Sequence, residues 1–166
     1  MAEARAAFTA ALTNWRTQKA SGSKLSRALE SWGRFLLSQR DPNGAAMAFH
    51  EALQMSEGHI TEAAVLSQAG LAAIAVSSGD AHAALSASQN AMDQLGHLEG
   101  YYDIRIKPYV WSIRARSLLL AGDYESARAL AHNARDAASA YYASDAATLI
   151  EAEGLLRNLP THASLR

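Results

Sequence analysis

The chain contains 166 residues, of which 15 are Lys or Arg and 16 are Asp or Glu, so its formal net charge at neutral pH is −1. This balance argues against direct nucleic-acid binding, which needs a basic surface, and a composition of 49% hydrophobic and 19% charged residues argues against intrinsic disorder. Cysteine is absent, which excludes disulfides, zinc–thiolate sites and thiol nucleophiles and fits a reducing cytoplasm.

The length suits one domain, which we expect over residues 1–160, followed by a tail at 161–166. The 37 alanines favour helices, and no strand pattern competes with them. No signal peptide is recognisable at the N-terminus. The longest charge-free apolar stretch, residues 63–79, is shorter than the ~20 residues that span a bilayer, so no membrane partner is expected.

In chain order, helical periodicity first predicts an unpaired helix within residues 1–20. Three helical hairpins are then predicted, over residues 25–56, 61–98 and 108–140. A single helix over residues 144–159 completes the predicted order as a C-terminal cap. All eight predicted elements are helices, so we expect an all-α fold. The short turns between them make neighbouring helices antiparallel.

Breaker residues mark the turn inside each hairpin. Gly79-Asp80 and Gly122-Asp123 each combine a glycine suited to a left-handed helix end with an aspartate suited to capping the next helix. The first hairpin has Arg40-Asp41 at this place, followed by proline. Pro108 suits the first turn of the sixth helix, because proline has no N–H to donate inside a helix.

A small pattern recurs on the second helix of each hairpin: an alanine, a residue four positions later, and an alanine three further on. The copies are Ala45/Phe49/Ala52, Ala84/Ser88/Ala91 and Ala127/Ala131/Ala134, with a weaker copy at Ala4/Phe8/Ala11. Their first alanines are 41, 39 and 43 residues apart. Such a period is typical of stacked repeats, whose usual function is to hold another molecule.

These residues resemble the tetratricopeptide repeat (TPR) family, in which each unit is a helical hairpin. The matching positions include Trp32, Gly33 and Phe49 in the first unit, and Trp111 and Ala115 in the third. The resemblance covers about residues 25 to 140 and implies a right-handed superhelical stack of hairpins. The period here is about 40 residues, whereas the family's usual period is 34. An unrelated helical bundle is the alternative fold.

In the family, the first helices of successive units line a concave groove, and this resemblance implies where a partner binds. The candidate partner-binding residues are Arg27, Arg34, Leu37, Leu66, Val76, Tyr109, Ser112 and Arg116. Glu30, Ser31, Ala69, Gly70, Ala73, Ile113 and Leu119 project to the same groove under this assignment.

Such a groove suits an apolar or amphipathic segment that carries acidic residues. Arg34 and Arg116 are candidate forks for carboxylates, and Tyr109 is a candidate rigid anchor. The competing interpretation is that the arginines are solvated surface residues and that Leu66 and Val76 pack between helices. Glu30, Gly70, Tyr109 and Ile113 stand where relatives that clamp chaperone tails carry other residues, which disfavours such tails as partners.

No catalytic or cofactor motif is present, and the histidines lack the paired spacing of metal ligands, so we expect no enzyme, cofactor or metal site. The first hypothesis is a noncatalytic protein-interaction scaffold that binds a peptide or helix of another protein. The alternative is a ligand- or peptide-sensing TPR domain of a larger transcription regulator or signalling ATPase. A secretion chaperone and an enzyme of unknown type are further alternatives.

The terminal helices carry two more expectations. The first predicted helix matches the second helix of a hairpin and has no first helix before it. This favours a chain that was cut from a longer protein, or an upstream helix that is missing. The apolar stripes on both terminal helices also allow self-association, so a homo-oligomer is possible.

Overall fold

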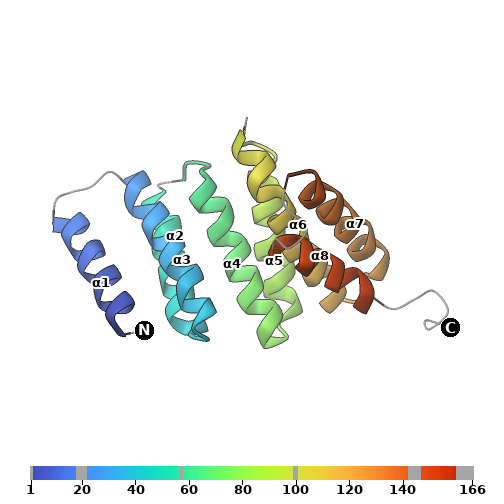
Figure 1. The fold of residues 1–166 in the computed structure, drawn as a ribbon, viewed down its shortest axis with the longest axis horizontal. Helices are drawn as coiled ribbons and strands as arrows, with labels where there is room; N and C mark the ends of the chain where they lie inside the picture. The colour runs from blue at the N-terminus through green and yellow to red at the C-terminus, as the bar shows by residue number, and fades with distance from the viewer. Residues whose placement is uncertain (1, 18–21, 57, 99–100, 142–146, 160–166) are drawn as a thin grey trace.

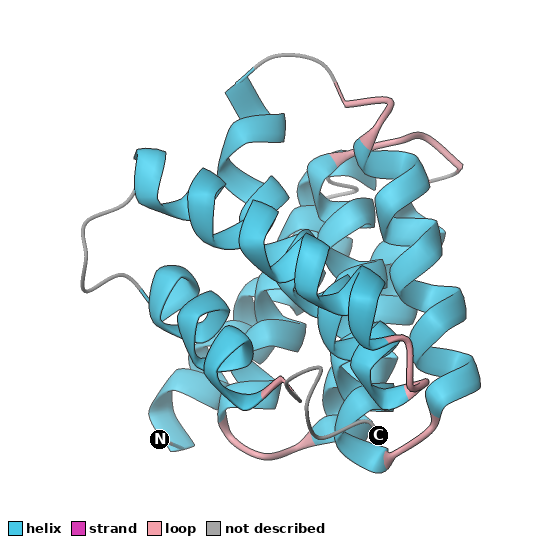
Figure 2. Ribbon diagram, turned by 90° about the vertical axis from the view of Figure 1, so that its right-hand side faces the viewer, coloured by secondary structure: helices cyan, strands magenta, loops and turns pink. Residues whose placement is uncertain are grey.

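The structure, a computed structural model, describes residues 2–17, 22–56, 58–98, 101–141 and 147–159. Within these residues all regular secondary structure is helical, so the all-α prediction is confirmed (Figure 2). The first residues of the predicted capping helix at 144–159, the tail at 161–166 and the last residues of the predicted helix at 1–20 lie outside the described residues.

Eight helices are described, and they follow the predicted order (Figure 1). They are α1 (Ala2–Thr17), α2 (Gly22–Ser38), α3 (Pro42–Met55), α4 (Glu62–Ser78), α5 (Ala81–Leu95), α6 (Tyr101–Leu120), α7 (Tyr124–Tyr141) and α8 (Ala147–Asn158). The helices pair as α2 with α3, α4 with α5 and α6 with α7. The chain is therefore a row of three hairpins flanked by one helix at each end.

The hairpins stack so that the helices form two layers. In the first layer α2 contacts α4, α4 contacts α6 and α6 contacts α8, whereas in the second layer α3, α5 and α7 do not contact one another. A cleft of about 490 Å³ lies between α3 and α5, with Leu71 and Ile74 of α4 among its lining residues. The first layer is thus the more closely spaced of the two.

The same backbone motif ends the first helix of every hairpin. Gly79 and Gly122 have φ angles of 77° and 85°, and the amide of the following aspartate donates to the carbonyl oxygen five residues before it, at 3.0 Å in both hairpins. Arg40 takes this position in the first hairpin with a φ of 59°, and the Asp41 amide donates to the Leu36 oxygen at 2.9 Å. The first hairpin therefore closes its turn with a left-handed residue that has a side chain.

Aspartate side chains then start the second helices. Asp41 accepts a hydrogen bond from the Gly44 amide at 2.9 Å, and Asp80 accepts one from the Ala83 amide at 2.9 Å. Asp123 accepts from the Ser126 amide at 3.1 Å. These bonds satisfy amides that the first turn of a helix leaves without intrahelical partners, so the predicted capping role of the Gly-Asp turns is confirmed.

The joint between the first two hairpins is filled by Phe49, which is completely buried. Its ring lies against Gly33 of α2 and Gly70 of α4, where an added Cβ would lie within 2.5 Å of the ring at either glycine. Gly70 therefore faces the core rather than a groove, contrary to the expectation from the repeat pattern. A large residue on one helix is matched by glycines on its two neighbours.

At the next joint the central triplet residue is small, and the neighbouring helix supplies the large side chain. Arg114 of α6 donates to the Leu85 oxygen at 2.9 Å and to Ser88 Oγ at 3.1 Å. At the third joint Ala131 belongs to the same buried cluster as Leu155 and Leu159 at the C-terminal side. The loss of the aromatic residue at Ser88 and Ala131 is thus compensated by larger partners from the following helix.

The prediction for the start of the sixth helix is wrong: α6 begins at Tyr101, and Pro108 lies inside it. A proline within a helix removes one hydrogen bond. Pro108 is fully buried, and Ile106 just before it is 5% exposed in the cluster that contains Val65 and Val110. Burial of this apolar segment against α4 and α5 explains why the helix continues through the proline.

Candidate partner-binding face

The α2 side of the first layer carries a nearly buried carboxylate held by an exposed arginine. Glu30 is 2% exposed. Its Oε1 lies 2.5 Å from Arg34 Nε, although the N–H does not point at it, and its Oε2 accepts from Arg34 Nη2 at 3.5 Å and from Ser31 Oγ at 3.3 Å. Burial raises the pKa of the Glu30 carboxyl, and the positive charge of Arg34 opposes that rise.

A second arginine–glutamate pair joins the other end of this layer. Arg116 of α6 donates from Nη1 to Oε1 of Glu151 in α8 at 2.8 Å. Both side chains are 37% exposed, so the pair lies at the surface. The pair links α6 and α8, which are successive helices of the first layer.

Tyr109 of α6 is half-buried, and the charges of both pairs influence the pKa of its phenol. Burial raises the pKa of its phenol to about 12, and the next largest influence is the negative charge of Glu151. The charges of Arg34, Glu30 and Arg116 also act on the pKa of this phenol. The two arginines oppose the rise in the pKa of Tyr109, whereas Glu30 adds to it.

The helix α4, which packs between α2 and α6, contributes small side chains. Ala69 and Leu66 are buried, while Ala73 and Val76 are half-buried. We call the surface made by Arg27, Ser31, Arg34, Glu62, Ala73, Val76, Tyr109, Arg116 and Glu151 the first-layer face.

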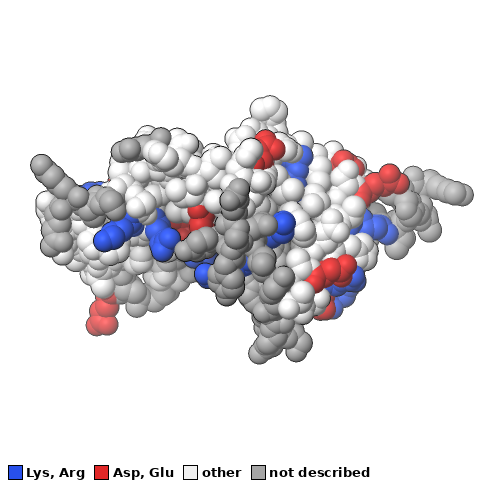
Figure 3. Space-filling view, turned by 90° about the horizontal axis from the view of Figure 1, so that it is seen from above, with Lys and Arg blue, Asp and Glu red and all other residues white. Residues whose placement is uncertain are grey.

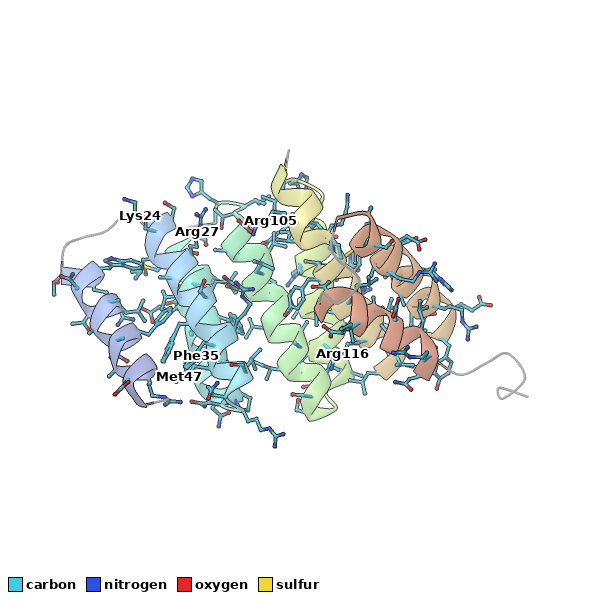
Figure 4. The ribbon with its side chains drawn as sticks, in the orientation of Figure 1. Lys24, Arg27, Phe35, Met47, Arg105 and Arg116 are labelled. Carbon is cyan, nitrogen blue, oxygen red and sulfur yellow. The ribbon has the colours of Figure 1, made fainter. Side chains whose placement is uncertain are left out.

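The structure brings some of the predicted partner-binding residues to this face and buries others. Arg27 and Arg34 are exposed, and Tyr109, Arg116 and Val76 are half-buried on first-layer helices. Figure 4 shows Arg27 on α2 and Arg116 by α8, on the side that faces the viewer.

Three of the predicted residues take part in packing instead. Leu66 is 7% exposed in the cluster around Val65, and Ser112 is completely buried. Leu37 is half-buried against the cluster that contains Phe49. Leu66 and Ser112 offer no surface to a partner in this structure, because their register on α4 and α6 turns them towards neighbouring helices.

Comparison with known proteins adds no family. No protein-family model matches the chain, and no curated protein matches its sequence. Any statement about what the chain binds therefore depends on its own residues.

Neither a metal-binding cluster nor a membrane-spanning helix occurs among the described residues. Across those ranges, no three or more His, Asp or Glu side chains gather in a way that could hold a metal ion. No described helix combines the length and apolarity required to cross a membrane. On the surface seen from above, acidic and basic side chains are interspersed among broad uncharged areas (Figure 3).

Sequence reasoning missed the partner of Arg116. Glu151 lies on α8, which follows the second helix of the third hairpin and so belongs to the first layer. The order of the helices therefore indicated that one side of α8, like one side of α6, contributes residues to the first-layer face. The half-burial of Tyr109 had no comparable signal in the sequence.

Proposed function

We propose that this protein is a noncatalytic interaction scaffold of the TPR type, and that it binds a peptide or helix of another protein along the first-layer face. We further propose that the stack is a right-handed superhelix with this face on its concave side. The support for the curvature is that α2, α4, α6 and α8 contact one another in sequence, whereas α3, α5 and α7 do not.

The observation that carries the proposal is the pair of arginines held in place by their own glutamates. Glu30 engages the Nε and Nη2 side of the Arg34 guanidinium, and 54% of the Arg34 side chain stays exposed. Glu151 engages only Nη1 of Arg116. Each guanidinium therefore retains N–H donors for a carboxylate of a partner, and its orientation is fixed before the partner arrives.

The partner we propose is an amphipathic segment with acidic residues. Ala73 and Val76 provide half-buried apolar side chains on α4, and Tyr109 provides a half-buried aromatic ring on α6. Because each arginine is already paired, the net charge of the face is small. Recognition would depend on directed hydrogen bonds and apolar contact more than on long-range attraction.

A random-peptide display library tests this proposal. The wild-type protein is expected to enrich acidic, amphipathic peptides, and a dye-labelled copy of an enriched peptide should lose measurable affinity for the double variant Arg34→Glu, Arg116→Glu. The double variant Arg135→Glu, Arg157→Glu changes the net charge equally at other sites and should bind as the wild type does. Unaltered binding to the first variant, with helicity preserved in circular dichroism, would refute the proposal.

A further inference from the structure

A cleft between α1 and α2 lies next to the first-layer face and combines aromatic and basic walls. Its volume is about 450 Å³. It is lined by Phe8, Trp15, Ser23, Lys24, Arg27, Ala28 and Ser31. Ser31 also donates to the Glu30 carboxylate, so the cleft adjoins the Glu30–Arg34 pair directly.

The aromatic wall consists of Phe8 and Trp15, and Phe8 is held by ring stacking. Phe8 of α1 stacks on Trp32 of α2 with ring centroids 4.7 Å apart, and Trp32 stacks on Phe35 with centroids 5.2 Å apart. Trp15, about two helical turns further along α1, is 38% exposed. A large aromatic surface open to water beside a cleft is typical of a site that takes an apolar side chain.

The basic wall has no internal counter-charge within the described ranges. Lys24 and Arg27 are both exposed, and neither has an ion pair or hydrogen bond with another described residue. This distinguishes them from Arg5 and Arg16 of α1, which pair with Asp41 and Glu51 of the α3 region. Figure 4 shows Lys24 and Arg27 together at the upper end of α2.

We propose that this cleft anchors one end of the acidic partner segment: a large apolar side chain of the partner packs against Trp15 and Phe8, and neighbouring carboxylates pair with Lys24 and Arg27. The argument is charge complementarity, because two cations without described partners border an apolar surface. The inference rests on the proposed function and names the feature by which the partner is recognised, an apolar anchor flanked by acidic residues.

The size of the cleft supports one anchor rather than a continuous groove. Ligand pockets begin at roughly 300 Å³, and the 450 Å³ here suits a single phenylalanine or leucine side chain with part of its backbone. The stripe of Arg27, Ser31 and Arg34 on α2 then leads from the cleft to the first-layer face, since residues four and three apart share a side of a helix.

The test uses a dye-labelled synthetic peptide in which one phenylalanine is flanked by aspartates. Two matched peptides replace the phenylalanine by serine or the aspartates by lysine. The first peptide is expected to bind the wild-type protein more tightly than either control, and to shield Trp15 from a soluble quencher. Equal binding of the three peptides would overturn the proposal.

Variants of the chain separate this inference from the proposed function. Lys24→Glu and Arg27→Glu, each alone, should raise the dissociation constant about tenfold, as expected for the loss of a charge-assisted contact, and Trp15→Ala should weaken binding similarly. Arg157→Glu is the matched control and should have no effect. If the display-selected peptide responds to Arg34→Glu, Arg116→Glu but not to Lys24→Glu, Arg27→Glu or Trp15→Ala, the cleft is not the anchor and the scaffold proposal stands. If it responds to none of them, both proposals fail.

Two other occupants give distinct results in the same experiment. Tighter binding of a single-stranded oligonucleotide than of the acidic peptide would assign the basic wall to phosphates and overturn the inference. A self-associating wild-type protein that Trp15→Ala converts to monomer, in sedimentation without peptide, would assign the cleft to a second copy and also overturn it.

Discussion

The ring of Phe49 occupies the space that the missing side chain of Gly70 leaves on α4. A Cβ placed at Gly70 would lie 2.5 Å from Cε2 of that ring, and Gly33 of α2 faces the same ring equally closely. One aromatic side chain from the second layer thus joins two first-layer helices. The spacing of α2 and α4, and hence of the side chains that they carry on the first-layer face, depends on this fit.

Gly70→Ala should therefore destabilise the protein. Phe49 is buried on all sides and cannot move away without disturbing its neighbours, so the added methyl group should cost about 1–3 kcal/mol of unfolding free energy, as overpacking usually does. Chemical denaturation measures the change. Phe49→Leu introduced into the Gly70→Ala variant should recover part of the loss, with a coupling of about 0.5–3 kcal/mol between the two sites.

Gly154→Ala is the matched control. Gly154 lies in α8, and a Cβ there would meet no atom within 4 Å. Alanine is the better helix former, so this variant should gain about 0.5–1 kcal/mol. Equal effects of alanine at Gly70 and Gly154 would show that the ring does not pack as described.

Arg40→Gly should stabilise the protein. Arg40 closes the first hairpin with a φ of 59°, a left-handed conformation that costs a side-chain-bearing residue about 1–2 kcal/mol. Glycine occupies the same position in the other two hairpins, so we expect a gain of about 1 kcal/mol in thermal or chemical unfolding. Gln39→Gly, one position earlier and without a positive φ, should lower stability instead.

Arg114→Ala should be costly, because the Arg114 guanidinium supplies hydrogen bonds to the Leu85 oxygen and to Ser88 Oγ. Its removal takes a charged donor away from both acceptors, although Ser88 Oγ still donates to the Leu85 oxygen at 3.2 Å, and it empties the joint between the second and third hairpins. We expect a loss of about 2–3 kcal/mol in unfolding free energy. Arg157→Ala, on exposed α8 surface, should change stability by less than about 0.5 kcal/mol; a similar loss at both positions would contradict this packing.

The pH dependence of stability should reveal Tyr109. Burial raises the pKa of the phenol from 10.0 to about 12 in the folded state. The unfolded chain then releases this proton at lower pH than the folded chain does, so the contribution of Tyr109 is complete below pH 10 and is lost as pH rises from about 10 to about 12.

Tyr109→Phe removes that contribution and provides the comparison. Over this pH range the wild type should lose up to about 2–3 kcal/mol more unfolding free energy than the variant does. Denaturant titrations at several pH values measure the difference. Parallel pH profiles for the two proteins would place the phenol in water.

The turns inside the hairpins could be predicted from the sequence, because they depend on a few adjacent residues. The Gly-Asp turns predict both the left-handed helix ends and the aspartate caps, because those features depend on neighbouring residues only. The start of α6 does not follow, because the cost of Pro108 inside the helix is offset by burial against distant segments of α4 and α5. Propensity rules alone cannot weigh such long-range contacts.

Part of the candidate site could likewise be predicted from the sequence, and part could not. The positions of Arg34 and Arg116 on first-layer helices follow from the repeat pattern, whereas the burial of Leu66 and Ser112 depends on how far each helix is rotated against its neighbours. The cleft between α1 and α2 could not be predicted from the sequence, because it depends on the stacking of Phe8 on Trp32 across two helices. Spacing along one helix carries no information about that contact.

Photocrosslinking of a library-selected peptide tests the central claim most directly. The peptide carries a photoreactive group, and mass spectrometry locates its attachment to the protein. The account predicts crosslinks on α2, α4, α6 and α8, on surface that Arg34 and Arg116 share. Crosslinks confined to α3, α5 and α7 would contradict it and would place the binding surface on the second layer.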